Sequence, residues 1–442
     1  MGGSAKKPPQ LTPRTAIPLP ISVAINYILP VILAVVIIGA VAPQTVFRVQ
    51  ASITRFTSGI CKNGGFVCGA IGYRYTSASP IGIISRTMAS SSSTAGELPF
   101  ARERRVAELA VQRAAVLSRA VYNSKVKGTV EKSDNSPVTI ADFGAQALVF
   151  ASLHKNFPDD NIIGEEDSAD LRSNGELSSL VFKTVTEALY ANATGQSSSD
   201  ELGVISDEAE MLDLIDKGGC TDSAKGRVWA LDPIDGTKGF LRGGQYAIAL
   251  GLLVDGVVQV GVLGCPNLGG EGGVLLSAVR GQGSVLRPLT ADFSTTDPSR
   301  VTMNPITTPS EATFCEGVET GHSNHNLQAK IAAGLGITKP SVRYDSQAKY
   351  AALAMGQAEI YLRLPSSMKY EEKIWDHAAG SLVVEEAGGL AVDMYGDQLD
   401  FTVGRTFKRN KGVIVMPKAI SEEVIRVVRE VAVEAYGTKS SL

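Results

Sequence analysis

Two acidic side chains end an apolar stretch of the sequence at a spacing that suits metal binding. In WALDPIDGTKGF, residues 229–240, Asp232 and Asp235 bracket a proline and an isoleucine. Because Pro233 restricts the backbone and has no amide hydrogen, we expect the two carboxylates to be held toward one point. Converging carboxylates repel each other unless they are protonated or neutralised by cations. Oxygen ligands without histidine or cysteine suit Mg²⁺, so this stretch predicts a magnesium site.

Further acidic side chains lie where predicted elements begin or end. Asp142 and Asp376 stand at predicted helix starts, and Glu165 and Glu166 follow a short apolar run. Each also has a structural explanation, because aspartates cap helices and glutamates occupy solvated turns. The Gly-Thr pair after the second aspartate of DPID lets a phosphate approach the backbone near a helix N-terminus. Carboxylates, magnesium and a phosphate-binding turn together indicate metal-assisted transfer of a phosphoryl group to water.

Helices and strands must bring these side chains together. Apolar residues at helical spacing predict an amphipathic helix from Arg102 to Val121, and a second helix starts around Asp142. Two apolar runs around Asp255-Gly256 predict a β-hairpin. The irregular mixture of strands and helices favours α/β layers with largely antiparallel pairing. Further strands are predicted at 161–167 and 358–365, helices at 375–389 and 420–436, and peripheral helices and loops at 168–226.

Three separated motifs resemble those of a known family. GEE, DPIDGTKGF and WDHAAG occur in the order typical of the lithium-sensitive, Mg²⁺-dependent phosphatases that include inositol monophosphatase. Other stretches, among them DSQAKY and YLRLP, are similar to the 3′(2′),5′-bisphosphate nucleotidases of that superfamily. The resemblance covers residues 100–435. It implies an α/β (α+β) fold, a layered αβαβα sandwich of the inositol monophosphatase/fructose-1,6-bisphosphatase type with two lobes.

The same resemblance assigns roles to individual side chains. It implies two or three Mg²⁺ ions per site, and it implies that Asp142 and Thr237 activate the attacking water. The implied metal ligands are Glu165, Asp232, Asp235, Asp376 and the backbone carbonyl of Ile234. The implied substrate-binding residues are Gly236 and Thr237 for the scissile phosphate, and His322, Ser346, Lys349 and Arg363 for the nucleotide.

The implied reaction is hydrolysis of the 3′-phosphate of adenosine 3′,5′-bisphosphate to AMP and phosphate. The resemblance extends it to 3′-phosphoadenosine 5′-phosphosulfate and to a role in sulfate assimilation. An inositol polyphosphate 1-phosphatase or inositol monophosphatase is the close alternative, and an inactive nucleotide-binding relative is another. Lys238 and the DSQAKY stretch favour the nucleotide, so the expected partner is a bisphosphorylated nucleotide. The protein is expected to be a monomer.

The N-terminal part of the sequence differs from the rest in charge. Met1–Gly96 has eight basic and no acidic residues, whereas the remainder has 34 basic and 45 acidic ones. This asymmetry predicts a leader, residues 1–95. The two-lobed fold that the resemblance implies places an N-terminal α+β lobe at 96–265 and a C-terminal α/β lobe at 266–442. The overall charge of −3 does not suggest nucleic-acid binding, and the five scattered cysteines indicate a reducing compartment without a zinc site.

The leader has three interpretations. Its acid-free, Ser- and Arg-containing composition is typical of a transit peptide for a plastid or mitochondrion. The apolar residues 24–42 are nearly long enough to cross a bilayer, so a retained membrane anchor is the second interpretation. In the third, Met88 is the true start and the protein is cytoplasmic. In all three, the leader lies outside the fold.

Overall fold

The computed structural model describes residues 98–437, except 125–129, 132–136, 194–198, 291, 293–294 and 319–324. Contacts within the chain separate Met1–Ser92 from Ser93–Leu442, and the described residues belong to the second unit. The predicted leader lies outside the described residues, so its interpretations stay predictions. No helix in the described ranges combines the length and the apolar character that a membrane span needs.

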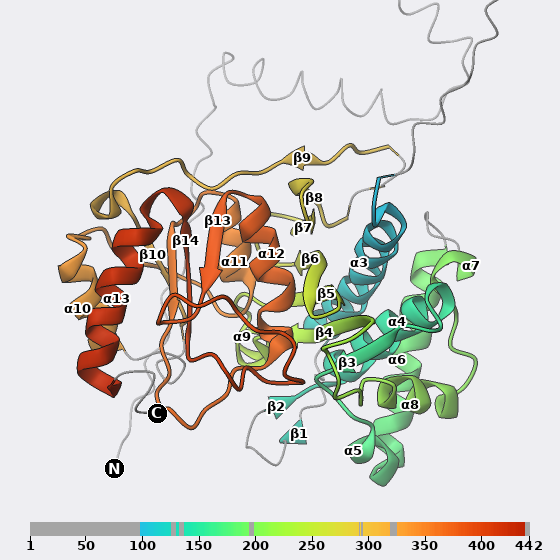
Figure 1. The fold of residues 1–442 in the computed structure, drawn as a ribbon. Helices are drawn as coiled ribbons and strands as arrows, with labels where there is room; N and C mark the ends of the chain where they lie inside the picture. The colour runs from blue at the N-terminus through green and yellow to red at the C-terminus, as the bar shows by residue number, and fades with distance from the viewer. Residues whose placement is uncertain are drawn as a thin grey trace, which may run out of the picture. The chain divides into compact units, whose positions relative to one another are not determined.

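The elements of the described unit are stacked in five alternating layers (Figure 1). Two helices cover one face of a seven-stranded sheet, and two others separate this sheet from a five-stranded sheet. A last pair covers the outer face of the second sheet, so the predicted αβαβα fold class is confirmed. In layer order, the helices are α3 (Ala101–Asn123) and α4 (Ile140–Asn156), α11 (Ala348–Ala354) and α12 (Ala378–Glu386), and α10 (His325–Gly334) and α13 (Ser421–Tyr436).

The seven-stranded sheet has its strands in chain order, and only its first pair is parallel. Its second strand, β4, ends in the DPID motif, and its pairing with β5 shifts register between Asp232 and Asp235. The predicted hairpin is confirmed, because Asp255 and Gly256 have positive φ angles between antiparallel strands β5 and β6. The strands are β3 (Asn161–Gly164), β4 (Arg227–Asp235), β5 (Ala247–Val254), β6 (Val257–Cys265), β7 (Val274–Val279), β8 (Gly283–Pro288) and β9 (Ser299–Arg300).

The second sheet has the order β11-β10-β12-β14-β13. Its β10 pairs in parallel with β11 and β12, and its other pairs are antiparallel. The predicted preference for antiparallel pairing therefore holds in the seven-stranded sheet, whereas the second sheet has two parallel and two antiparallel pairs. The strands are β10 (Phe314–Glu316), β11 (Val342–Arg343), β12 (Ile360–Arg363), β13 (Gly389–Val392) and β14 (Val413–Pro417).

Alternating side chains of β4 face two different hydrophobic cores. Trp229 and Leu231 are buried against α3 and α4, whereas Val228 and Ala230 are buried toward α11 and α12. A strand that is apolar on both faces lies inside the sandwich. Its polar end, the DPID motif, therefore lies at an edge of the layers. A third core fills the space between the second sheet and α10 and α13.

Helix α12 approaches the first sheet unusually closely. Gly251 on β5 pairs with Gly261 on β6, and both lie under the first turn of this helix. A Cβ atom at Gly261 would lie 2.6 Å from the carbonyl oxygen of Ala379, and one at Gly251 would lie 3.0 Å from the Cβ of Ala378. The paired glycines thus allow the start of α12, just after Asp376, to lie directly on the sheet that carries DPID.

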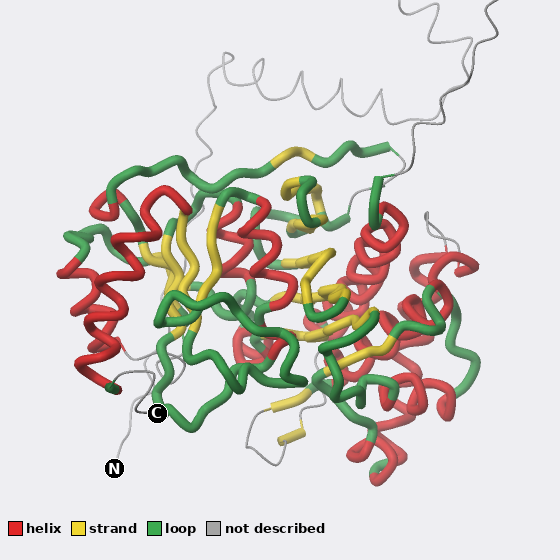
Figure 2. The backbone as a smooth tube through the Cα atoms, viewed as in Figure 1, coloured by secondary structure: helices red, strands yellow, loops and turns green. Residues whose placement is uncertain are grey.

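Further elements lie around the layers, as the backbone view also shows (Figure 2). The segment predicted to hold peripheral helices and loops contains α5 (Ala169–Ser173), α6 (Gly175–Ala193), α7 (Ser199–Leu202) and α8 (Glu208–Asp216). The predicted lobe boundary at residue 265 stays a prediction; β6 ends there, and β7 to β9 continue the same sheet. The remaining elements are β1 (Val130–Glu131), β2 (Pro137–Val138), α9 (Thr237–Arg242), η1 (Pro309–Glu311), η3 (Ile374–Asp376) and η4 (Lys418–Ile420).

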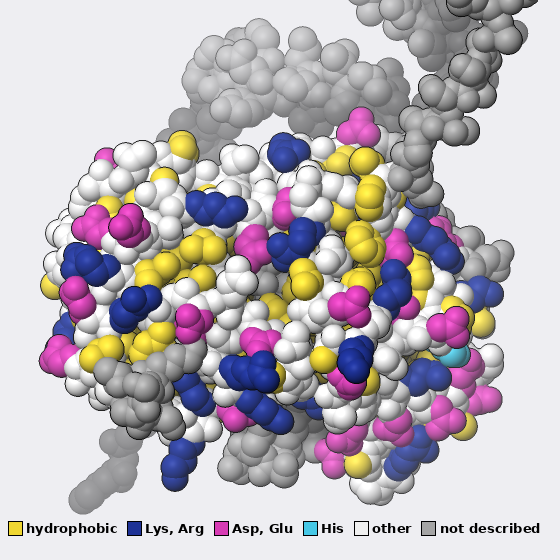
Figure 3. Space-filling model, viewed as in Figure 1, with side chains coloured by type: hydrophobic (Ala, Val, Ile, Leu, Met, Phe, Trp, Pro, Cys, Tyr) yellow, Lys and Arg dark blue, Asp and Glu magenta, His cyan; other side chains and the backbone are white. Residues whose placement is uncertain are grey.

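The face of the molecule in Figure 3 carries acidic and basic side chains side by side. Dark blue and magenta groups alternate across it, and neither sign forms a continuous patch on this view. Such a mixed surface has no single-sign field of the kind that attracts polyanions.

Candidate active site

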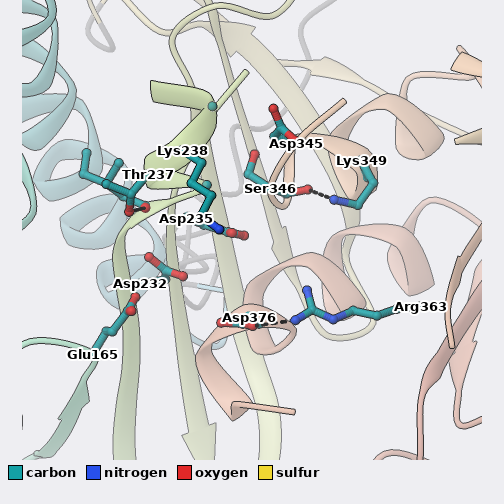
Figure 4. Close-up of a pocket in the computed structure, with 13 residues that line it drawn as sticks. Glu165, Asp232, Asp235, Thr237, Lys238, Asp345, Ser346, Lys349, Arg363 and Asp376 are labelled. Atoms are coloured by element: carbon teal, nitrogen blue, oxygen red, sulfur yellow. Dashed lines mark hydrogen bonds and ion pairs between the residues drawn. The ribbon is translucent and has the colours of Figure 1, made fainter. Parts of the chain in front are cut away.

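One pocket of about 210 Å³ brings together most of the predicted site residues (Figure 4). Its acidic side chains come from the ends of β3 and β4, from η3 and from the loop before α11, and its basic side chains come from α9, α11 and β12. The pocket is therefore formed where the first sheet, the middle helices and the second sheet meet. Its lining residues are Glu165, Asp232, Ile234, Asp235, Gly236, Thr237, Lys238, Gly239, Asp345, Ser346, Lys349, Arg363 and Asp376.

Asp232 has a carboxylate oxygen for which the fold provides no partner. The residue is 2% exposed, and its Oδ1 atom is buried without a hydrogen bond to any described residue. Burial raises the pKa of Asp232 well above its usual range, and the nearby carboxylates of Glu165, Asp235 and Asp376 raise it further. A buried anion that is neither paired nor hydrogen-bonded is costly, so this oxygen faces a place for a cation.

Asp235 lies between the acidic and the basic sides of the pocket. Its Oδ2 atom accepts a hydrogen bond from the backbone N–H of Gln347 at 2.7 Å. Burial raises the pKa of Asp235, and Lys349 and Arg363 oppose this effect. The proline-containing turn of DPID therefore presents its second carboxylate to both a metal site and a pair of cations.

Asp376 does not cap the following helix. It ends the 3₁₀ turn η3, while α12 starts at Ala378 after His377. The structural alternative of an N-cap is thus wrong here, because the turn aims the carboxylate into the pocket instead (Figure 4). Burial raises the pKa of Asp376 well above its usual range, although Arg363, 3.5 Å away, favours the charged form.

A divalent cation that binds oxygen, such as Mg²⁺, suits the carboxylates of Glu165, Asp232, Asp235 and Asp376. The lining residues of the pocket include no cysteine, methionine or histidine, so its acidic donors are all carboxylate oxygens. One of these oxygens, Asp232 Oδ1, is buried without a hydrogen-bond partner among the described residues. Ile234 lines the same pocket, and its carbonyl oxygen accepts from the hydroxyl of Thr237 at 3.2 Å. Hard cations prefer such oxygen ligands.

Asp142 is the third residue of its helix rather than the cap. Thr139 is the N-cap of α4, and its hydroxyl accepts from the N–H of Ala141 at 3.1 Å. Asp142 completes the capping box, since its Oδ2 atom accepts from the backbone N–H and from the hydroxyl of Thr139, both at 2.7 Å. The other oxygen, Oδ1, accepts from the hydroxyl of Thr237 at 3.3 Å, so the predicted pair does meet.

The predicted nucleotide-binding residues form the opposite wall. Ser346 has a φ angle of 65°, in the left-handed region, and its carbonyl oxygen accepts from the ammonium group of Lys349 at 2.8 Å. Burial lowers the pKa of Lys349, and Asp235 opposes this shift. Arg363 bonds through Nε to Glu372 at 2.7 Å. His322 lies outside the described residues, so its role stays a prediction.

Several residues of the site were not singled out from the sequence. Glu372 is buried beside Arg363, which lowers the pKa of Glu372 to about 2 although burial alone would raise it. His377 is buried and its Nδ1 atom lies 2.7 Å from the hydroxyl of Tyr350. Glu372, Asp376 and His377 lie close enough to share an ion, but Arg363 and Tyr350 already contact this group. No local pattern indicates such a network, because its members come from different elements.

Asp345 is the first residue of the DSQAKY stretch, and the resemblance implies no role for its side chain. It is buried and its Oδ2 atom accepts from Arg242 of α9 at 2.6 Å. The sequence indicates a role for it only in that this aspartate directly precedes Ser346, a predicted substrate-binding residue. The ion pair joins the helix after DPID to the wall that carries Ser346.

Comparison with known proteins shows which family this chain is similar to. The chain matches the sequence profile of the inositol monophosphatase family over residues 102–432. It is 52% identical over 354 residues to a 3′(2′),5′-bisphosphate nucleotidase of Emericella nidulans, covering 76% of this chain and 99% of that protein. It is 40% identical to a 3′(2′),5′-bisphosphate nucleotidase of Oryza sativa, covering 78% of this chain and 98% of that protein.

A solved structure shows the same fold. The IMPase of Thermotoga maritima superposes with a TM-score of 0.51 at 20% identity, covering 75% of this chain and 99% of the bacterial one. The predicted resemblance is confirmed by the sequence relatives, and the fold class by the structural one. The chain belongs to the inositol monophosphatase family, within the group of relatives named 3′(2′),5′-bisphosphate nucleotidases.

Proposed function

We propose that this protein is a magnesium-dependent phosphatase that removes the 3′-phosphate of adenosine 3′,5′-bisphosphate, yielding AMP and phosphate. The unpartnered oxygen of Asp232, buried among other carboxylates, carries the proposal, because it requires a cation in a pocket that also contains Lys349 and Arg363. The names of the similar Emericella and Oryza proteins support the choice of a bisphosphorylated nucleotide.

Glu165, Asp232, Asp235 and Asp376 would hold the magnesium, together with the carbonyl of Ile234. When bound, Mg²⁺ polarises the phosphoryl group and makes water a stronger nucleophile. The protein's own part is to hold the proton acceptor. Asp142 is fixed by two hydrogen bonds from Thr139, which leaves its Oδ1 atom to take a proton by way of the Thr237 hydroxyl.

The basic wall supplies specificity for a second phosphate. Lys349 is buried and Arg363 is held by Glu372, so both cations are directed before a ligand arrives. Arginine and lysine bind phosphate oxygens strongly when they are partly desolvated. A bisphosphorylated ligand can then contact the carboxylate-bound cations with one phosphate and this wall with the other. Adenosine 3′-phosphate 5′-phosphosulfate has the same two anionic ends and is proposed as a second substrate.

The test is phosphate release by the full-length protein with Mg²⁺ from adenosine 3′,5′-bisphosphate, 5′-AMP, inositol 1-phosphate and inositol 1,4-bisphosphate. We expect the highest kcat/KM for adenosine 3′,5′-bisphosphate. Lys349→Met should lower this value by about tenfold or more, as expected for a lost charge-assisted bond, and should change the value for inositol 1-phosphate much less. Preference of the wild-type protein for either inositol phosphate would overturn the assignment of the nucleotide.

A further inference from the structure

We infer that Gln347 is a positioning residue that sets the geometry between the carboxylates of Asp235 and Asp376. The inference rests on the proposed function and extends it to a residue that contacts neither carboxylate with its own side chain. Gln347 precedes α11, is 1% exposed, and lies between the two elements that carry these aspartates.

The backbone and side chain of Gln347 bind different sides of the site. Its N–H donates to Oδ2 of Asp235 at 2.7 Å. Its side-chain amide donates to the carbonyl oxygen of Trp375 at 2.9 Å and accepts from the N–H of Gly380 at 3.1 Å. One residue therefore connects the end of β4, the turn just before Asp376, and the first turn of α12.

The backbone around Gln347 is held in a costly conformation. The preceding residue, Ser346, has a φ angle of 65°, which for a residue with a Cβ costs on the order of 1–3 kcal/mol. A Cβ at Gly236 would lie 2.9 Å from the Cβ of Ser346, so the DPID turn and this segment are in direct contact. Asp345 anchors the same segment through its ion pair with Arg242. Such strain persists only where the surroundings over-determine the geometry.

The connection matters because the two aspartates lie on different elements, far apart in the sequence. Asp235 is attached to the first sheet, and Asp376 to a 3₁₀ turn that precedes α12. Residues that orient metal ligands typically change metal affinity by about 10- to 100-fold when removed. Without its side-chain amide, Gln347 still donates its backbone N–H to Asp235 but no longer bonds to Trp375, the residue before Asp376.

The experiment measures Mg²⁺ binding to the full-length protein by calorimetry, together with thermal unfolding in EDTA. We expect Gln347→Met, which keeps the chain length and removes the amide, to weaken Mg²⁺ binding by about tenfold. Its kcat should be largely recovered at high Mg²⁺. Gln347→Asn, one methylene too short to reach both partners, should show an intermediate affinity and serves if the first variant does not fold.

Asn410→Leu is the matched control. Asn410 is also a buried amide that joins backbone groups, since it donates to Gln398 O at 2.9 Å and accepts from Asp400 N–H at 2.7 Å. It does not line the pocket, and its loss should lower the melting temperature with unchanged Mg²⁺ affinity. If the Gln347 variants lose only stability, as this control does, the positioning role is wrong. If the wild-type protein itself fails to bind Mg²⁺, the proposed function is wrong instead.

Discussion

At the scale of single residues, the buried carboxylate of Asp232 is the clearest indication of a cation site. Its Oδ1 atom has no hydrogen-bond partner among the described residues, and four other acidic residues raise its pKa in addition to burial. A fold retains such a group only where a ligand compensates for it, because an unpaired buried charge destabilises the protein. Two predictions concern this side chain.

Asp232→Asn should abolish hydrolysis and leave the fold intact. The amide keeps the shape of the side chain but removes the charge that a divalent cation requires. We expect kcat/KM to fall by about a thousandfold or more, equivalent to about 4 kcal/mol of transition-state stabilisation. Phosphate-release kinetics and circular dichroism measure the two parts of this prediction. Near-normal turnover would refute the assignment of Asp232 as a metal ligand.

The stability of the metal-free protein should fall as the pH rises through the raised pKa of Asp232. An acid whose pKa is higher in the folded state binds more protons when folded, so the free energy of unfolding decreases with increasing pH. The decrease begins near the ordinary aspartate pKa and ends above the raised one. Thermal unfolding in EDTA across this range should show a weaker decrease for Asp232→Asn. An identical pH dependence in the two proteins would argue against the raised pKa.

At the scale of elements, the start of helix α4 combines a structural task with the chemical one that we propose for Asp142. The capping box of Thr139 and Asp142 stabilises the helix and also orients the carboxylate that meets Thr237. A similar coupling occurs at η3, where the turn that ends in Asp376 precedes α12. In both places, the local hydrogen bonds that define an element also determine the direction of a site residue.

Thr139→Ala should weaken both functions of this cap. It removes the hydroxyl that bonds to Asp142, so we expect the free energy of unfolding to fall by about 1 kcal/mol. We also expect kcat to fall by about tenfold with little change in KM, since the general base loses its orientation. Denaturant titration and steady-state kinetics measure these effects. Thr139→Ser retains the hydroxyl and should recover most of both; failure of this rescue would separate the cap from catalysis.

At the scale of the whole molecule, the site depends on how closely α12 packs on the first sheet. The glycine pair on β5 and β6 removes side chains at the point of contact, and Asp376 directly precedes this helix. Larger residues there would push the helix, and with it one metal ligand, away from the ends of β3 and β4.

Gly261→Ala should therefore destabilise the protein by about 1–3 kcal/mol, since the new methyl group would overpack the interface with Ala379. We expect weaker Mg²⁺ binding as well, measured by calorimetry beside thermal unfolding. Gly175→Ala is the control, because a Cβ at this position of α6 contacts nothing within 4 Å. Equal stability of the two variants would contradict the close packing of α12.

The local chemistry of this protein could be predicted from short stretches of its sequence. DPID followed by Gly-Thr indicates converging carboxylates beside a phosphate-binding turn, because the proline and the isoleucine between the two aspartates determine their spacing. The hairpin at Asp255-Gly256 and the helix near Asp142 likewise depend on neighbours in the chain, although the cap proved to be Thr139.

Only the tertiary structure decided which distant residues complete the site. Glu165, Asp235 and Asp376 converge because strand register and the packing of α12 bring three separate elements to one edge. The same packing leaves Asp232 Oδ1 without a hydrogen-bond partner among the described residues and places Gln347 between the elements that carry Asp235 and Asp376. A sequence pattern reports preferences over a few residues, whereas burial and missing partners depend on contacts between segments far apart in the chain.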